Sequence, residues 1–181
     1  MKFPKIVYIF ICTLFFASCS QNLDFSQIDD FSVSSVYNNS LVYFKLTPSK
    51  FIDPNSGNEI DLPTDVTNIT FFQYRFIKKN LAKAVFNLEI KNEIHRDIDI
   101  QVNFLNSNNN IVYQLNQLNI AANQLDFKHE EIVEVSGNPS ILNATRVSVK
   151  VNLSPSGTAL SSSDTSEFEF KSSVSLFIET N

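Results

Sequence analysis

The chain has 181 residues, which leaves room for a leader segment and one ordinary domain, because folded domains cluster at about 100–150 residues. Hydrophobic residues make up 43% of the sequence and charged residues 18%, a balance that predicts a globular domain and excludes a disordered polyelectrolyte. With three Gly, no Trp and a net charge of −5, the composition excludes Gly-rich phosphate loops and argues against nucleic-acid binding.

Residues 1–18 have the three zones of a secretory signal peptide: two lysines, an apolar run of 11 residues from Ile6 to Phe16, and a small-residue exit. The run is too short for a membrane-spanning helix, which needs about 20 residues. Phe16-Ala17-Ser18-Cys19 resembles a bacterial lipobox, which implies that Cys19 becomes the lipidated first residue of the mature chain. A soluble secreted protein with a free thiol is the alternative.

The cysteine content and the charge of the chain agree with lipidation. Cys12 lies in the apolar run and is removed with it, so Cys19 is the only cysteine left and no intramolecular disulfide can form. Cleavage also removes two of the 14 basic residues and none of the 19 acidic ones, which leaves a formal charge of −7. An anionic lipid surface repels such a chain as a whole. We therefore expect attachment through acyl chains, followed by a flexible tether that ends at residue 30.

From residue 31 to residue 181 the sequence predicts strands, because apolar residues recur at every second position. The clearest strands cover residues 81–94, 97–104, 146–153 and 167–178, and weaker ones cover residues 31–37, 41–47, 68–76, 111–118 and 125–135. Turn-forming residues separate them, and the Asn108–Asn110 cluster is expected to supply positive φ in a hairpin turn. No segment has convincing helical periodicity, and Ala121–Gln124 is at most one helical turn.

Nine short strands predict an all-β domain, an antiparallel β-sandwich of the immunoglobulin-like kind. A small closed barrel is the alternative. The long strand Phe168–Ile178 is expected in the middle of a sheet, because at an edge it would favour aggregation. The expected core consists of the apolar sets of four strands: Phe86, Leu88, Ile90, Ile98, Ile100, Val102, Phe104, Val147, Val149, Val151, Phe168, Phe170 and Leu176.

The lipobox, the 21 Asn and 17 Phe residues, and the segments Phe86–Glu93 and Leu118–Asn123 make the chain similar to an uncharacterised family of small flavobacterial (Bacteroidota) cell-envelope lipoproteins. The resemblance implies a location at the outer membrane, on its periplasmic face or at the cell surface. It implies no particular activity.

Two turns and one aromatic segment hold the candidate binding residues. Asp53 and Asn55 belong to a turn that faintly resembles a calcium loop, although turn formation explains the same composition. Asn108 belongs to a second loop, and loop ends are where sandwiches usually bind. Phe71 and Arg75 would form a protein-contact patch if their strand exposes them.

Three further side chains of the aromatic segment alternate with Phe71 and Arg75 and are expected in the core: Phe72, Tyr74 and Phe76. His95, Asp97 and Asp99 share one face of a predicted strand, and we expect that face to be solvated rather than to bind a metal ion. The charged stretch His129–Glu131 is also expected at an edge or on a solvent face.

The sequence contains no Gly-x-Ser-x-Gly motif, no cysteine pair and no cofactor motif. We therefore expect no catalytic residue, no metal ion and no cofactor. The expected function is that of a non-catalytic, lipid-anchored envelope protein that acts as a protein-interaction or structural module. The alternative is a glycan-binding module, with Tyr37, Tyr43 or Tyr113 as the aromatic contact.

Overall fold

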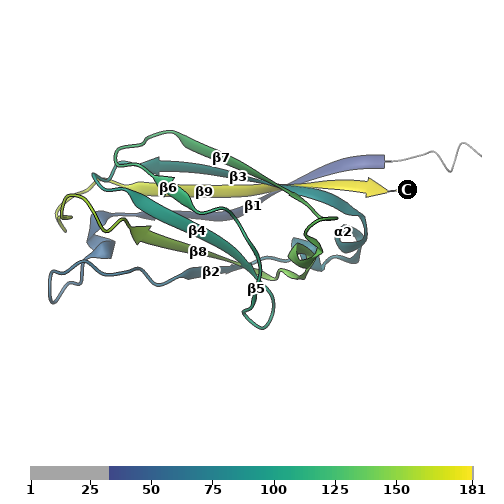
Figure 1. Cartoon of the computed structure of the whole chain (residues 1–181), viewed down its shortest axis with the longest axis horizontal. Coiled ribbons are helices and arrows are strands. Elements are labelled where there is room, and N and C mark those ends of the chain that lie inside the picture. The colour runs from purple at the N-terminus through teal and green to yellow at the C-terminus, as the bar shows by residue number, and fades with distance from the viewer. Residues whose placement is uncertain (1–32, 181) are drawn as a thin grey trace, which may run out of the picture. The chain divides into compact units, whose positions relative to one another are not determined.

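Two antiparallel sheets, built from nine strands, pack face to face in the part of the chain that the structure describes, residues 33–180 of a computed structural model (Figure 1). Sheet A has the order β1 (Val33–Leu46), β9 (Phe168–Thr180), β3 (Leu81–Asn92) and β7 (Phe127–Glu134). Sheet B has the order β2 (Asp65–Asn68), β8 (Arg146–Leu153), β4 (Ile98–Leu105) and β5 (Ile111–Gln114), and β6 (Leu118–Ile120) pairs with β4. The sandwich prediction is confirmed. The predicted signal peptide, the lipidated Cys19 and the tether lie outside the described residues.

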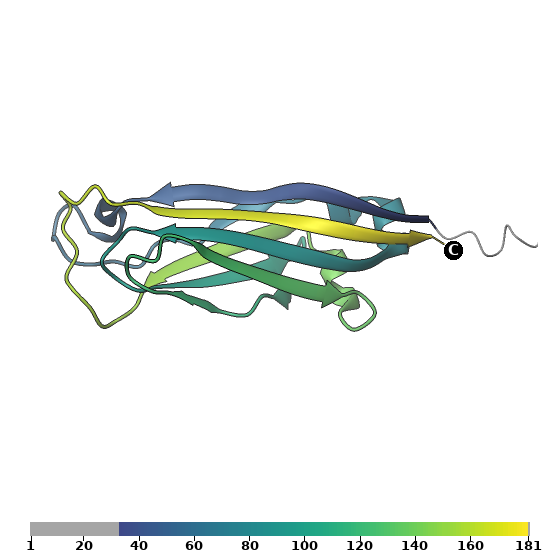
Figure 2. The same ribbon diagram turned by 90° about the horizontal axis from the view of Figure 1, so that it is seen from above.

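Alternation of apolar and polar residues places one face of each long strand in the core. All thirteen side chains predicted for the core are buried, and the rings of Phe86 and Phe104 meet between the sheets with centroids 4.8 Å apart. The long strand β9 lies between β1 and β3, as predicted (Figure 2). Its position leaves β1 and β7 as the edges of sheet A.

The number of strands agrees with the prediction, but four of the predicted strands differ from the observed ones. The two strands expected between residues 31 and 47 form one strand, β1, with a bulge in its middle. The strand expected over residues 111–118 is divided into β5 and β6, which pair with different parts of β4.

The strand expected over residues 68–76 is wrong, because only its first residue lies in a strand. The segment continues as the 3-10 helix η3 (Phe71–Gln73) and the short helix α2 (Arg75–Asn80). Its buried residues after β2 are Ile69, Phe72 and Ile77, a spacing that a helical segment can bury and a strand cannot. No helix within residues 33–180 is long and apolar enough to cross a membrane.

The connections follow the predicted turn chemistry in part. Asn109 has a φ of 64° in the β4–β5 hairpin, which confirms that this cluster supplies positive φ. Ala121–Gln124 is a β-turn rather than a helical turn, closed by the Gln124 N–H donating to the Ala121 carbonyl at 3.2 Å. Two further 3-10 helices occur in connections, η2 (Pro48–Phe51) and η4 (Pro139–Asn143).

Candidate functional site

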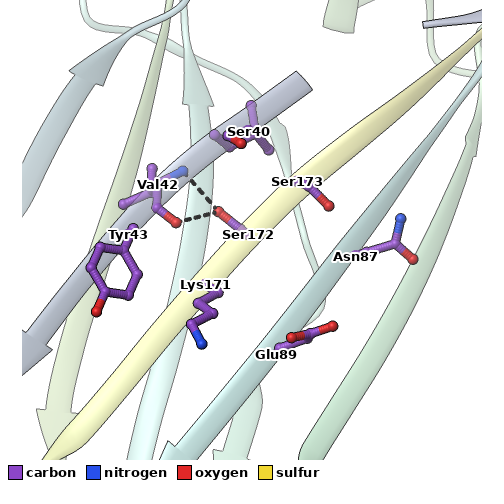
Figure 3. Close-up of a pocket in the computed structure, with 9 residues that line it drawn as sticks. Ser40, Val42, Tyr43, Asn87, Glu89, Lys171, Ser172 and Ser173 are labelled. Carbon is purple, nitrogen blue, oxygen red and sulfur yellow. Dashed lines mark hydrogen bonds between the residues drawn. The ribbon is translucent and has the colours of Figure 1, made fainter. Parts of the chain in front are cut away.

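The outer face of sheet A is hollowed where β1, β9 and β3 run side by side (Figure 3). The strand register places Tyr43 beside Lys171 and Lys171 beside Glu89. The next row along the strands brings together smaller side chains, those of Ser40, Ser173 and Asn87. The groove has a volume of about 450 Å³, and nine residues line it: Ser40, Leu41, Val42, Tyr43, Asn87, Glu89, Lys171, Ser172 and Ser173.

A β-bulge in β1 shapes this groove. Leu41 and Val42 together oppose the single residue Ser172, so the ladder between β1 and β9 is interrupted there. The Ser172 hydroxyl compensates, because its Oγ accepts a hydrogen bond from the Val42 N–H at 3.1 Å and donates one to the Val42 carbonyl at 3.2 Å. Figure 3 shows both bonds. The Ser172 hydroxyl therefore satisfies both backbone groups of Val42 at the bulge. The Tyr43 side chain, which follows the bulge, lies exposed above the groove.

The charged side chains beside the groove are partly neutralised by their neighbours. The Lys171 ammonium lies 2.8 Å from Glu169, and this hydrogen bond raises the pKa of Lys171 and lowers that of Glu169. Lys45 bridges Glu167 at 2.7 Å on the same face, and the bond raises the pKa of Lys45. Glu89 has no ion-pair partner within residues 33–180. The groove can therefore offer one unpaired carboxylate, several hydroxyl and amide groups, and an exposed phenol ring.

The groove lacks the arrangement that nucleophilic catalysis needs. Its serines are not hydrogen-bonded to a histidine, and neither His95 nor His129 lines it. Among residues 33–180 no group of three or more His, Cys, Asp or Glu side chains could hold a metal ion.

Asp53 and Asn55 lie in a turn that their own hydrogen bonds hold. The Asp53 carboxylate accepts hydrogen bonds from the N–H groups of Asn55, at 2.7 Å, and Ser56, at 3.1 Å, and these bonds lower the pKa of Asp53. Gly57 completes the turn with a φ of 71°. Turn formation thus occupies one carboxylate oxygen of Asp53.

Asn108 lies at the tip of the β4–β5 hairpin, where its N–H donates to the Asn106 side-chain oxygen at 2.9 Å. The Asp53–Glu59 turn lies at the other end of the sandwich, because Glu59 contacts Arg96, just before β4, whereas Asn106 follows β4 (Figure 1). The two loops predicted as binding regions therefore cannot form one site.

Phe71 begins η3 and Arg75 begins α2, so both residues lie on helical turns and not on a strand. Phe71 is half-buried and its ring meets that of Phe72 edge-on at 4.5 Å, while Arg75 is exposed at the start of α2. Of the three aromatic residues expected in the core, Phe72 is fully buried, whereas Tyr74 and Phe76 are exposed. The expectation for Tyr74 and Phe76 is wrong because the helical backbone turns these two side chains outward.

The stretch His129–Glu131 was expected on an edge or solvent face, and β7 is indeed an edge strand, but two of the three side chains point inward. Glu131 is buried, and its carboxylate accepts hydrogen bonds from the Tyr113 hydroxyl at 3.2 Å and the Asn116 N–H at 2.9 Å. Burial, together with the Glu131 charge, raises the pKa of Tyr113. These contacts close the sandwich where the neighbour of β4 changes from β5 to β6.

Asp97 and Asp99 also serve the structure. Asp97 accepts a hydrogen bond from the Ala122 N–H, and Asp99 accepts one from the Asn119 amide, both at 2.8 Å. His95 is exposed beside them. These bonds tie β4 to the segment around β6.

Sequence reasoning weighed Tyr43 as an aromatic contact but missed its neighbours Lys171, Ser173, Asn87 and Glu89. The alternation correctly places these four on the wet faces of their strands. The strand order β1-β9-β3 decides which of these solvent-facing residues become neighbours and which strand the bulge faces. No local sequence pattern specifies that order.

No protein-family model matches the chain, and no curated protein matches it at a significant level. Solved structures with similar folds include a "putative secreted protein" from Parabacteroides distasonis, with 14% identity, a TM-score of 0.46 and 81% of this chain covered. They also include the VP2 subviral particle of infectious bursal disease virus, with 12% identity, and tailspike protein 4 of bacteriophage CBA120, with 11% identity. For both, the TM-score is 0.40 and 80% of this chain is covered. The chain spans 38%, 32% and 19% of these three proteins, respectively. At such identities the likeness is one of fold alone.

Proposed function

We propose that this protein is a lipid-anchored, non-catalytic envelope protein that binds a protein partner through the outer face of sheet A. The observation that carries the proposal is the distribution of charge on that face. The outward side chains at its centre are uncharged: Val36, Asn38, Ser40, Val85, Asn87, Ile132, Ser173, Ser175 and Phe177. Charged residues surround them: Lys83, Glu89, Lys128, Glu130, Glu134 and Lys171. We call the uncharged set the sheet A patch.

The sheet A patch has the composition of a protein interface, which is depleted of charge at its centre and polar at its rim. Val36 and Ile132 are about half exposed in it, and Tyr43 stands at its border with 61% of its surface exposed. Aromatic and large aliphatic side chains exposed together supply the anchors of a partner contact. No strand within residues 33–180 pairs with the outer edge of β1, next to the patch, so this edge offers additional backbone groups for pairing.

Photocrosslinking in intact cells tests this proposal. A photoreactive amino acid replaces Asn38 in the patch or, as the control, Ile111 on β5 in sheet B, which is 57% exposed. We expect an adduct with one envelope protein from position 38 and none from position 111. The charge-inserting variant Ile132→Lys should abolish the adduct, whereas Ile111→Lys should leave it. Identical adducts from both positions would contradict the proposal.

Anchoring through Cys19 is tested separately by fractionation. The wild-type protein should stay with the membranes after a high-salt wash, and the Cys19→Ala variant should become soluble, because stable attachment needs more than one acyl chain. A Cys19→Ala variant that still sediments with washed membranes would place the anchor elsewhere.

Glycan binding is the second candidate function, favoured by the exposed ring of Tyr43 above hydroxyl and amide groups in the groove. Tyr74 is the matched control, because it is also 61% exposed and lies outside the groove. On a glycan array, Tyr43→Ala should lose binding and Tyr74→Ala should retain it. Hydrolysis of any glycan that is lost on Glu89→Gln would overturn both candidate functions.

A further inference from the structure

The segment from η3 through α2 exposes aromatic side chains that the core does not need. Tyr74 is 61% exposed and Phe76 50%. The segment is already held in the fold by Phe72 and Ile77, both of which are buried. Tyr74, Phe76 and Tyr37 of β1 border an apolar cavity of about 370 Å³ between α2 and the inner side of sheet A. Exposed aromatic residues gathered around a cavity indicate a contact surface.

The same segment concentrates positive charge in an otherwise acidic protein. Arg75, Lys78, Lys79 and Lys83 are four of the twelve basic residues within 33–180, and no acidic residue occurs between residues 66 and 88. Arg75, Lys78 and Lys79 are exposed, and none of them forms an ion pair within residues 33–180. Among the strands of residues 33–180 that end or begin here, the acidic residues are Glu134 of β7, opposite Lys83, and Glu179 of β9. Within the described residues, basic side chains therefore outnumber acidic ones around the exposed aromatic residues.

This surface lies at the end of the sandwich where the chain enters it. Val33, the first residue of β1, pairs with Thr180, and Leu81, which directly follows α2, pairs with Ile178 (Figure 1). Thirteen residues lie between Cys19 and Val33. A flexible chain of that length has a root-mean-square span of about 20 Å. An acyl anchor at Cys19 would thus hold this end of the sandwich close to the bilayer.

We propose that the basic aromatic surface formed by Tyr74, Arg75, Phe76, Lys78 and Lys79 docks on the anionic headgroup layer of the membrane that holds the lipid anchor. The proposal rests on the anchoring at Cys19 proposed above. Aromatic rings favour the interface between water and lipid, and lysine and arginine are attracted to anionic lipids. The net negative charge of the whole chain does not prevent this contact, because screening limits electrostatic effects to about 8–10 Å at physiological salt.

Docking at this end would orient the whole domain. The Asp53–Glu59 turn, at the opposite end of the sandwich, would point away from the membrane. The groove and the sheet A patch, which run along the side of the sandwich, would remain open to a partner. Docking through this surface would therefore give the binding face a defined orientation relative to the membrane.

The absence of tryptophan from the chain allows a direct test. The Phe76→Trp variant and its control Tyr43→Trp, in the groove, each introduce a single fluorophore. Both proteins are acylated and reconstituted into vesicles that contain either phosphatidylglycerol or only phosphatidylcholine. In the phosphatidylglycerol vesicles, we expect lipids brominated near the headgroup to quench Phe76→Trp several-fold more than Tyr43→Trp. Equal quenching of the two variants would overturn the proposal.

The contribution of the charges is measured without the acyl chains, on the mature chain carrying Cys19→Ser. Arg75→Ala, Lys78→Ala and Lys79→Ala together should weaken its binding to phosphatidylglycerol vesicles by about a hundredfold, because each basic residue near an anionic surface contributes several-fold. Lys50→Ala, Lys128→Ala and Lys150→Ala give the same net charge from exposed positions elsewhere and should change binding little. Equal weakening by the two sets would refute a localised surface.

Other outcomes separate this proposal from its competitors and from the anchor itself. Mass spectrometry reports acylation of Cys19, so a missing acyl group contradicts the anchor, while vesicle binding of the Cys19→Ser chain still tests the surface. A concentration-dependent blue shift of Phe76→Trp without vesicles would show that a second copy covers the surface. That result would overturn the membrane contact.

Discussion

Arg96 joins three segments at one end of the sandwich, and its removal should destabilise the domain. Arg96 is only 6% exposed, in the connection between β3 and β4. Its Nε donates to the Ser154 carbonyl at 2.8 Å, and its Nη1 donates to the Thr158 carbonyl at 2.7 Å. Both guanidinium ends also reach the Glu59 carboxylate, at 3.2 and 3.4 Å. The side chain thus ties the Asp53–Glu59 turn to the β8–β9 connection.

The contacts of Arg96 set the expected magnitude. A hydrogen bond from a charged group contributes about 1.5 kcal/mol or more, so the two carbonyl contacts amount to about 3 kcal/mol. The Glu59 carboxylate is 35% exposed, and the pair adds at most about 1 kcal/mol, because water replaces part of the lost interaction. Arg96→Ala should therefore lower the free energy of unfolding by about 3–4 kcal/mol. For a domain of this size that corresponds to a fall in Tm of about 10 °C.

Urea denaturation followed by far-UV circular dichroism measures this change. Arg96→Ala should lower the urea midpoint at an unchanged m value. Arg96→Lys keeps the charge but not the planar guanidinium, so its midpoint should lie between those of the wild-type protein and Arg96→Ala. Arg75→Ala is the control, since Arg75 is exposed and should change stability by no more than about 0.5 kcal/mol. A loss below about 1 kcal/mol for Arg96→Ala would refute the reasoning.

Gly157 offers an independent check on the same contacts. Its φ is 142°, and a Cβ at this position would lie 2.5 Å from the Arg96 Cδ. Since four hydrogen bonds hold the Arg96 side chain, it cannot move aside without breaking some of them. Gly157→Ala should therefore be destabilising, and less so in the Arg96→Ala background. Strictly additive effects would show that the two residues are not coupled.

Three further predictions concern the core, the bulge and acid stability. Phe104→Ala should cost about 3–5 kcal/mol in calorimetry, because the ring is fully buried; a loss under about 1 kcal/mol would contradict this. Ser172→Ala should cost about 1–3 kcal/mol in urea denaturation and speed amide exchange at Val42, which loses both bonds to the hydroxyl; unchanged exchange would count against it. Hydrogen bonds lower the pKa values of Asp53 and Glu169 in the folded protein below their ordinary values of 3.8 and 4.5. The two ionised carboxylates therefore stabilise the fold fully above these ordinary values, and this stabilisation is lost as the pH falls through the lowered values. The urea midpoint should decrease below about pH 4, and an increase there would contradict the prediction.

Errors in the sequence prediction have a common physical cause. The segment Asn68–Phe76 alternates well enough to suggest a strand, yet it turns into η3 and α2, because Phe72 and Ile77 are the residues that fill the end of the sandwich. Similarly, Glu131 reads as solvated, but β7 packs it against Tyr113 and Asn116, which satisfy its carboxylate. In both cases contacts between distant segments outweigh the local pattern.

The sequence by itself determined the all-β class, the wet and dry faces of the long strands and the core residues that these strands contribute, because the direction of a side chain on a strand depends only on its position along that strand. It could not determine which strands are neighbours. The groove exists because Ser172 meets a bulge 130 residues away in the chain, at Val42, and the buried Arg96 finds Glu59 and Thr158 in separate loops. Such contacts arise only when the sheets assemble, so tertiary structure alone decided where the candidate binding surfaces lie.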